Sequence, residues 1–156
     1  MKTELILVGK TNDKNFQAGI DDYCQRIGHY MPFSITVIPE LKNTKSLSFQ
    51  EQKEREGELI LAKLQSSDHV VLLDEHGKDF RSVEFARWIE QKNASVRRLV
   101  FVIGGPYGFS EAVYSRANEK ISLSKMTFSH QMVRLVFVEQ IYRACTIIKG
   151  EPYHHE

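Results

Sequence analysis

Five short apolar runs recur along the chain, and polar or amphipathic segments separate them. A continuous apolar run is typical of a strand that is covered on both faces, as in a parallel sheet. Several runs end at residues that interrupt strands, such as Gly9, Pro39 and Gly104. The predicted strands are residues 5–8, 33–38, 70–73, 99–103 and 121–123.

Apolar positions at helical spacing predict one helix between each pair of strands and one after the last strand. Ser48-x-x-Glu51 is a capping-box signature, and Ser110 and Ser129 are suited to cap two later helices. Residues 74–77, Asp-Glu-His-Gly, are predicted to form a turn. The predicted helices are residues 16–27, 48–64, 83–89, 110–118 and 129–149.

Strands that alternate with helices predict an α/β fold with a mostly parallel sheet flanked by helices. The chain has 156 residues, which is an ordinary length for one domain. It contains no internal repeat, low-complexity tract or linker. We therefore expect a single domain over residues 1–156.

The last predicted helix is apolar on nearly all sides. Such a helix is either a central core helix or has one face against a partner subunit, and we favour the interface of a homodimer. Glu139 and Arg143 are four residues apart and can pair on the helix surface, whereas Arg134 is expected to be the more exposed arginine.

Composition limits the classes of function. The formal net charge is +1, whereas a protein that binds nucleic acid through its overall charge is usually far more basic. Cys24 and Cys145 are isolated in sequence, which suggests reduced thiols. No signal peptide is recognisable and no apolar stretch approaches the ~20 residues of a membrane span. We expect a soluble, cytoplasmic protein without a membrane partner.

The ends of three predicted strands are unusual and are expected at one edge of the sheet, where open α/β proteins bind ligands. They are Leu73-Asp74, the glycine loop Gly104-Gly105-Pro106-Tyr107-Gly108, and the hydroxyl-rich residues 123–128. The loop matches neither the dinucleotide fingerprint nor the Walker A motif. Taken separately, the glycine loop is equally well explained as a tight turn. Residues 123–128, taken separately, are explained as an ordinary strand–helix junction. Together they predict a cofactor site whose contacts come from the main chain.

The six histidines include no pair at zinc-binding spacing, so no metal is expected. His130 is the imidazole best placed for chemistry, although a helix-terminal histidine bonded to the backbone explains it equally well. A mild basic excess near Tyr153 is a weak signal for RNA binding. No Ser-His-Asp order or convincing carboxylate pair supports a hydrolase.

Four motifs in a fixed order resemble the ribosomal RNA large subunit methyltransferase H family, and with residues 5–10 and the length the resemblance covers essentially the whole chain. It implies a SPOUT-type methyltransferase with a C-terminal trefoil knot that acts as a homodimer. The implied reaction is S-adenosylmethionine-dependent methylation of N3 of a pseudouridine, position 1915 in the usual numbering, in helix 69 of 23S rRNA on assembled 70S ribosomes. The motifs are Phe101-Val102-Ile103-Gly104-Gly105-Pro106-x-Gly108, Leu123-Ser124-Lys125-Met126-Thr127-Phe128-x-His130-Gln131-Met132-x-Arg134, Glu139-Gln140-x-Tyr142-Arg143-Ala144 and Pro152-Tyr153-His154.

The resemblance also implies site residues. Arg143, Tyr153 and His154 are expected to hold the base, and His130 or His154 to assist loss of the N3 proton. His155 stands where relatives often carry Lys or Arg. The expected cofactor contacts are Leu73, Gly104, Gly105, Leu123, Ser124, Lys125, Met126, Thr127 and Phe128.

Two alternatives remain open at the level of sequence. A ribosome-associated RNA-binding module without catalysis needs the basic tail but no glycine loop. A methyltransferase that acts on tRNA shares the cofactor pocket and differs only in substrate.

Overall fold

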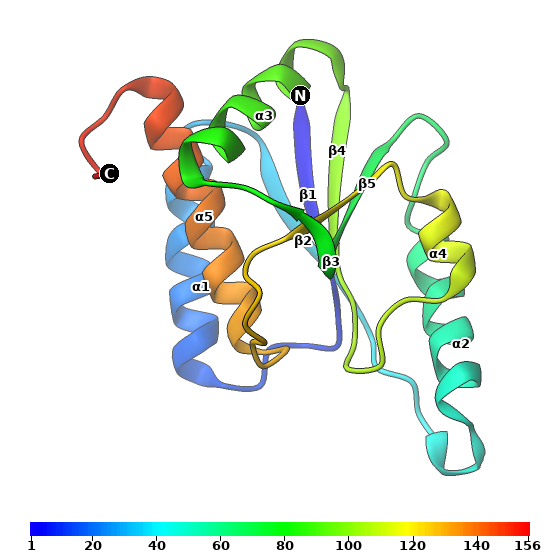
Figure 1. The fold of residues 1–156 in the computed structure, drawn as a ribbon. Coiled ribbons are helices and arrows are strands. Elements are labelled where there is room, and N and C mark those ends of the chain that lie inside the picture. The colour runs from blue at the N-terminus through cyan, green and yellow to red at the C-terminus, as the bar shows by residue number, and fades with distance from the viewer.

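The computed structural model describes residues 1–156, and its centre is a five-stranded sheet, which Figure 1 shows between two layers of helices. All neighbouring strands are parallel and the order is β2-β1-β4-β3-β5. The carboxyl ends of all five strands therefore lie at one edge. The strands are β1 (Lys2–Val8), β2 (Phe33–Ile38), β3 (His69–Asp79), β4 (Arg98–Ile103) and β5 (Glu119–Ser122).

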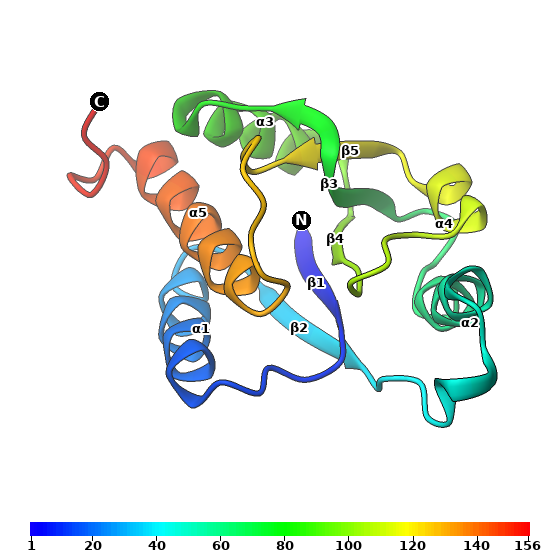
Figure 2. The ribbon, with the colours of Figure 1, turned by 60° about the horizontal axis from the view of Figure 1, so that its bottom comes forward.

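Helices cover both faces of the sheet, with α1, α3 and α5 on one face and α2 and α4 on the other (Figures 1 and 2). Successive strand residues point to opposite faces, so Leu5 and Leu7 join one apolar core while Ile6 and Val8 join the other. The helices are α1 (Lys14–Ile27), α2 (Phe49–Leu61), α3 (Ser82–Ser95), α4 (Glu111–Arg116) and α5 (Met132–Lys149), and a 3-10 turn spans Thr44–Ser46.

The predicted α/β fold and parallel sheet are confirmed, and the predicted caps are present. Ser48 and Glu51 form a capping box at the start of α2, and the Ser110 hydroxyl accepts the Val113 N–H at 3.3 Å. The Ser129 hydroxyl accepts the Met132 N–H at 3.0 Å, one turn before the place where α5 becomes regular. No helix is both long and apolar enough to cross a bilayer.

The prediction of a turn at residues 74–77 was wrong, because β3 continues through them to Asp79. Ile121 of β5 pairs first with Leu73 and then, after a shift of register, with Lys78. Gly77 makes this possible, since a Cβ atom there would lie 2.6 Å from the backbone nitrogen of Ile121. The glycine permits a close approach of two strands and not a reversal of the chain.

Helix α5 packs on the sheet between α1 and α3 (Figure 1). Phe137, Val138 and Ile141 are fully buried in the core of the same chain, which accounts for much of the apolar character of α5. The expectation that Arg134 is exposed was wrong: its exposed fraction is 1%. Its guanidinium donates to the Val8 carbonyl at 2.6 Å and to the Thr11 hydroxyl at 3.0 Å, so it ties the start of α5 to the end of β1.

Candidate active site

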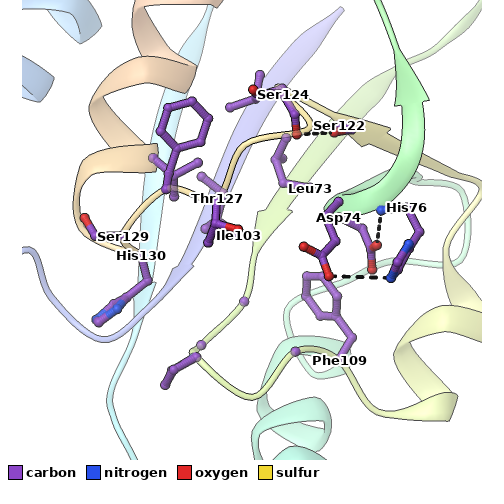
Figure 3. A pocket seen from close by; sticks show the side chains of 18 of the residues that line it. Leu73, Asp74, His76, Ile103, Phe109, Ser122, Ser124, Thr127, Ser129 and His130 are labelled. Carbon is purple, nitrogen blue, oxygen red and sulfur yellow. Dashed lines mark hydrogen bonds and ion pairs between the residues drawn. The ribbon is translucent and has the colours of Figure 1, made fainter.

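The ends of β3, β4 and β5 enclose a cavity of about 640 Å³ at the carboxyl edge of the sheet (Figure 3). Figure 3 shows the side chains of Leu73, Ile103 and Thr127 near its middle, with His130 on one side and Asp74 and His76 on the other. This volume falls in the range of roughly 300–1,000 Å³ that is usual for small-molecule sites. The three unusual strand ends that the sequence placed at one edge do converge there.

The glycine loop that follows β4 forms one wall. The Gly105 N–H donates to a carboxylate oxygen of Glu56 at 3.1 Å, and the Gly108 N–H donates to the Gly105 carbonyl at 3.2 Å. Gly108 has φ +83°, a conformation that favours glycine. A Cβ atom on Gly104 would lie 2.8 Å from the Phe109 ring. The loop is thus a tight turn, and it also exposes backbone to the cavity.

Residues 123–128, which follow β5, form the second wall. None of their backbone groups pairs with another backbone group. Only two local bonds involve them: the Ser122 hydroxyl donates to the Ser124 carbonyl at 2.9 Å, and the Met126 N–H donates to the Ser124 hydroxyl at 2.9 Å. Backbone N–H and C=O groups nearly always have partners in proteins. This wall therefore presents a row of main-chain donors and acceptors that a ligand can use.

Asp74, at the bulge of β3, gives the third wall a negative charge. Burial acts to raise the pKa of Asp74, but hydrogen bonds from the Tyr114 hydroxyl and from the His76 N–H, the latter at 2.8 Å, outweigh it and hold the pKa below its usual value. Burial and the same carboxylate raise the pKa of Tyr114 to about 12. Asp74 is accordingly ionised and Tyr114 neutral at pH 7, which favours positive charge in the cavity.

The other predicted catalytic residues gather on the second half of α5, where the C-terminal tail folds back against Arg143. Arg143 donates to Glu139 at 2.7 Å, as the sequence spacing predicted, and its guanidinium carbon lies 4.8 Å from the Tyr153 ring centre. The Tyr153 hydroxyl donates to Glu139 at 3.1 Å. Burial and the Glu139 carboxylate raise the pKa of Tyr153, which keeps the phenol neutral. We call Arg143, Tyr153 and His154 the tail cluster.

His154 has a defined tautomer within the tail cluster. A guanidinium can only donate, and an Arg143 nitrogen lies 3.0 Å from Nδ1 of His154, so Nδ1 is the acceptor. In the neutral ring the proton is then on Nε2, which is buried and has no hydrogen-bond partner. The Nε2–H makes no hydrogen bond, and a Glu156 carboxylate oxygen lies 3.9 Å from Nε2.

The tail cluster is remote from the cavity of its own chain. His130 lines the cavity just before α5 begins, whereas Arg143 lies eleven residues after Met132 in this helix, and Tyr153 and His154 fold back from the helix end onto Arg143. At about 1.5 Å per residue, eleven residues span about 16 Å along the helix axis. Figure 1 shows the C-terminus beyond the far end of α5, outside the layer of α1 and α5.

The structure therefore divides the predicted site residues into two groups. Lys125 is exposed and does not line the cavity, and the tail cluster lies apart from it. Glu56 and Tyr114 could not be predicted from sequence patterns, because their contacts with the site join residues 49 and 40 positions apart. The predicted residues that line the cavity are Leu73, Gly104, Gly105, Leu123, Ser124, Met126, Thr127, Phe128 and His130.

Comparison with known proteins identifies the family of the chain. The sequence model of the family described as "Predicted SPOUT methyltransferase" matches residues 1–154. Proteins named ribosomal RNA large subunit methyltransferase H are similar over the full length of both sequences, with 65% identity in Bacteroides fragilis, 63% in Phocaeicola vulgatus and 56% in Flavobacterium johnsoniae. The parallel sheet, the main-chain cavity at its carboxyl edge and these matches together establish that the chain belongs to the SPOUT methyltransferase family.

Proposed function

We propose that this chain is an S-adenosylmethionine-dependent methyltransferase that methylates N3 of the pseudouridine at position 1915, in helix 69 of 23S rRNA. The family membership supports methyl transfer, and the names of the relatives support ribosomal RNA of the large subunit as the substrate. The observation that carries the proposal is the row of unpaired main-chain groups in residues 123–128, which lines the cavity beside Gly104.

The residues of the cavity fit this cofactor. A nucleoside has donors and acceptors on the edge of its base, which match the carbonyl and N–H groups of the backbone, and its flat ring suits apolar walls such as Leu73, Ile103 and Leu123. The ionised Asp74 favours a positively charged sulfonium nearby. When bound, S-adenosylmethionine supplies an activated methyl group.

We further propose that the active unit is a homodimer with the trefoil knot of the SPOUT fold. Residues 123–131 lead from β5 past the glycine loop to α5, and both segments line one cavity, as a knotted arrangement requires (Figure 2). Arg143 lies about 16 Å along α5 from the helix end beside the cavity of its own chain, and no residue of the tail cluster lines that cavity. A second copy of the protein can supply its tail cluster to that cavity.

Within such a site the protein's residues have separate roles. N3 of the base must lose a proton before it can accept a methyl group, and negative charge then develops on the flanking carbonyl oxygens. Arg143 and the unused Nε2–H of His154 are suited to stabilise that charge, while Tyr153 supports the base. The tautomer of His154 makes it a donor, so we assign assistance of proton loss to His130, which lines the cavity.

The nearly neutral net charge of +1 favours a substrate that is already assembled. Tight binding to free rRNA depends on many cationic contacts with phosphates. We therefore propose the assembled 70S ribosome, in the cytoplasm, as the substrate. Equal methylation rates on free 23S rRNA and on assembled ribosomes would contradict this part of the proposal.

Calorimetry with S-adenosylmethionine and mass spectrometry of rRNA test the proposed function together. We expect micromolar binding, and we expect one methyl group to be lost from pseudouridine 1915 in cells without this protein. An RNA-binding module without catalysis predicts no cofactor binding and no lost methyl group. A tRNA methyltransferase predicts cofactor binding but intact rRNA methylation, so each rival gives a distinct result.

Variants of the tail cluster test the assignment of the base-binding residues. Y153A and H154A are expected to keep wild-type affinity for S-adenosylmethionine, because both residues lie outside the cavity of their own chain. Loss of a positioned donor in the reaction is expected to lower kcat by roughly 100-fold. Methyl transfer to ribosomes measures this, and wild-type turnover in both variants would contradict the assignment.

A further inference from the structure

Glu56 is an unusual carboxylate. It projects from α2 on the side of the cavity's glycine loop, it is partly buried, and no cationic side chain lies within 4.0 Å of it. Its hydrogen-bond partner is the Gly105 N–H, at 3.1 Å. Burial raises the pKa of Glu56 although the Gly105 hydrogen bond acts in the opposite sense. A carboxylate without a cation in such a place costs free energy, so its position calls for an explanation.

The contact with Glu56 fixes the orientation of one peptide unit. No peptide bond in the protein is cis, so the Gly104 carbonyl points away from the Gly105 N–H of the same unit. The N–H points toward α2, and the carbonyl therefore points away from α2. That carbonyl accepts no hydrogen bond from the protein, and Gly104 lines the cavity.

The close fit of Glu56 against the loop limits other orientations. A Cβ atom on Gly105 would lie 2.8 Å from a carboxylate oxygen of Glu56, so the absence of a side chain permits the contact. Phe49 lies seven residues before Glu56, on the same face of α2, and its ring stacks on Tyr107 with centres 4.2 Å apart. Helix α2 thus holds the glycine loop at two points.

We propose that Glu56 is a positioning residue, which holds the Gly104–Gly105 peptide so that the Gly104 carbonyl can accept a hydrogen bond from an amino or hydroxyl group of a nucleoside in the cavity. This inference rests on the proposed function, because it takes the ligand to be the nucleoside part of S-adenosylmethionine. Glu56 does not touch the ligand and acts only through the backbone.

Three variants test the role of Glu56. E56A removes the acceptor, E56Q keeps an oxygen that can accept the Gly105 N–H, and E58A is a matched control on the exposed side of α2. We expect the dissociation constant for S-adenosylmethionine, measured by calorimetry, to rise about tenfold in E56A and less than threefold in E56Q and E58A. We expect amide hydrogen exchange at Gly105 in the free protein to accelerate in E56A alone.

The outcomes separate this inference from the proposed function. If the wild-type protein binds no S-adenosylmethionine, the proposed function fails, whatever the variants do. If the wild-type protein binds and E56A binds equally well, or E56Q is as weak as E56A, the positioning role is overturned. A thermal melt of each variant shows whether it is folded. If E56A is unfolded, E56Q is the test: hydrogen exchange at Gly105 as slow as in wild type supports the positioning role, and faster exchange overturns it.

Discussion

At the scale of single residues, the site depends on main-chain groups that side chains do not cover. Gly104 and residues 123–128 offer main-chain groups, so the chemistry of their side chains says little about the ligand. The sequence could locate these positions because each follows an apolar run that ends abruptly. It could not locate Glu56, because an exposed-looking carboxylate in a charged helix has no pattern that reports its contact with Gly105.

Replacing Gly104 by alanine is expected to weaken cofactor binding. The new Cβ would lie 2.8 Å from the buried Phe109 ring, so the ring or the loop must move. We expect overpacking to lower the free energy of unfolding by about 1–3 kcal/mol and the affinity for S-adenosylmethionine by about tenfold. Denaturant unfolding and calorimetry measure the two effects. G28A, at an ordinary helix end with φ −58°, is the matched control, and equal affinity in G104A and G28A would contradict this prediction.

The carboxyl group of Glu56 also predicts a pH dependence of stability. Its pKa is raised in the folded state, so the folded protein holds this proton more tightly than the unfolded chain does. The stability linked to protonation is complete below the ordinary carboxyl pKa and is lost as pH rises through the raised value. Denaturant unfolding across pH 4 to 7 should therefore show wild type losing stability relative to E56Q as pH rises. If wild type instead gained stability relative to E56Q as pH rises, the prediction would be contradicted.

At the scale of elements, apolar runs located all five strands, whereas interactions between strands decided the details. The strand of residues 33–38 has the predicted bounds, since a proline follows it directly. Residues 74–77 have turn-forming composition, yet they extend β3, because Gly77 fits against the backbone of β5. Helix α5 is apolar mainly because two neighbouring helices and the sheet cover it within one chain.

Arg134 is expected to be a major link between α5 and β1. R134A removes the hydrogen bonds to Val8 and Thr11 and leaves a cavity, so we expect the free energy of unfolding to fall by about 2–4 kcal/mol. R134M fills the space without burying a charge, so its free energy of unfolding should fall less than that of R134A. R87A, at an exposed position of α3, should stay within about 0.5 kcal/mol of wild type. Denaturant unfolding of all three checks the order, and a larger loss in R134M than in R134A would contradict it.

At the scale of the whole molecule, a single polypeptide keeps the tail cluster out of the cavity, with Arg143 about 16 Å along α5 from the helix end beside it. Sequence periodicity predicted a parallel sheet but not the strand order, because the order depends on which crossovers skip a strand. It also could not show that Arg143, Tyr153 and His154 assemble away from His130. The resemblance of motifs named these residues together, whereas the fold of one chain places them apart.

Mixing two impaired variants, at a concentration of S-adenosylmethionine too low to saturate G104A, tests whether the tail cluster acts in a second subunit. G104A impairs the cavity and H154A the tail, so a mixed dimer has one intact cavity that faces one intact tail. Random exchange of equal amounts should restore about a quarter of wild-type methyl transfer, because half of the dimers are mixed and each has one working site. If the tail serves its own chain, or if the protein sediments as a monomer, mixing restores nothing.

The account depends most on where the nucleoside binds, and a crystal structure with bound S-adenosylmethionine tests this directly. We predict density for the nucleoside between the glycine loop of residues 104–108 and the wall of residues 123–128, with the Gly104 carbonyl and the backbone of that wall as its polar contacts. Density at any other place on the protein, or contacts made chiefly by side chains, would contradict the account.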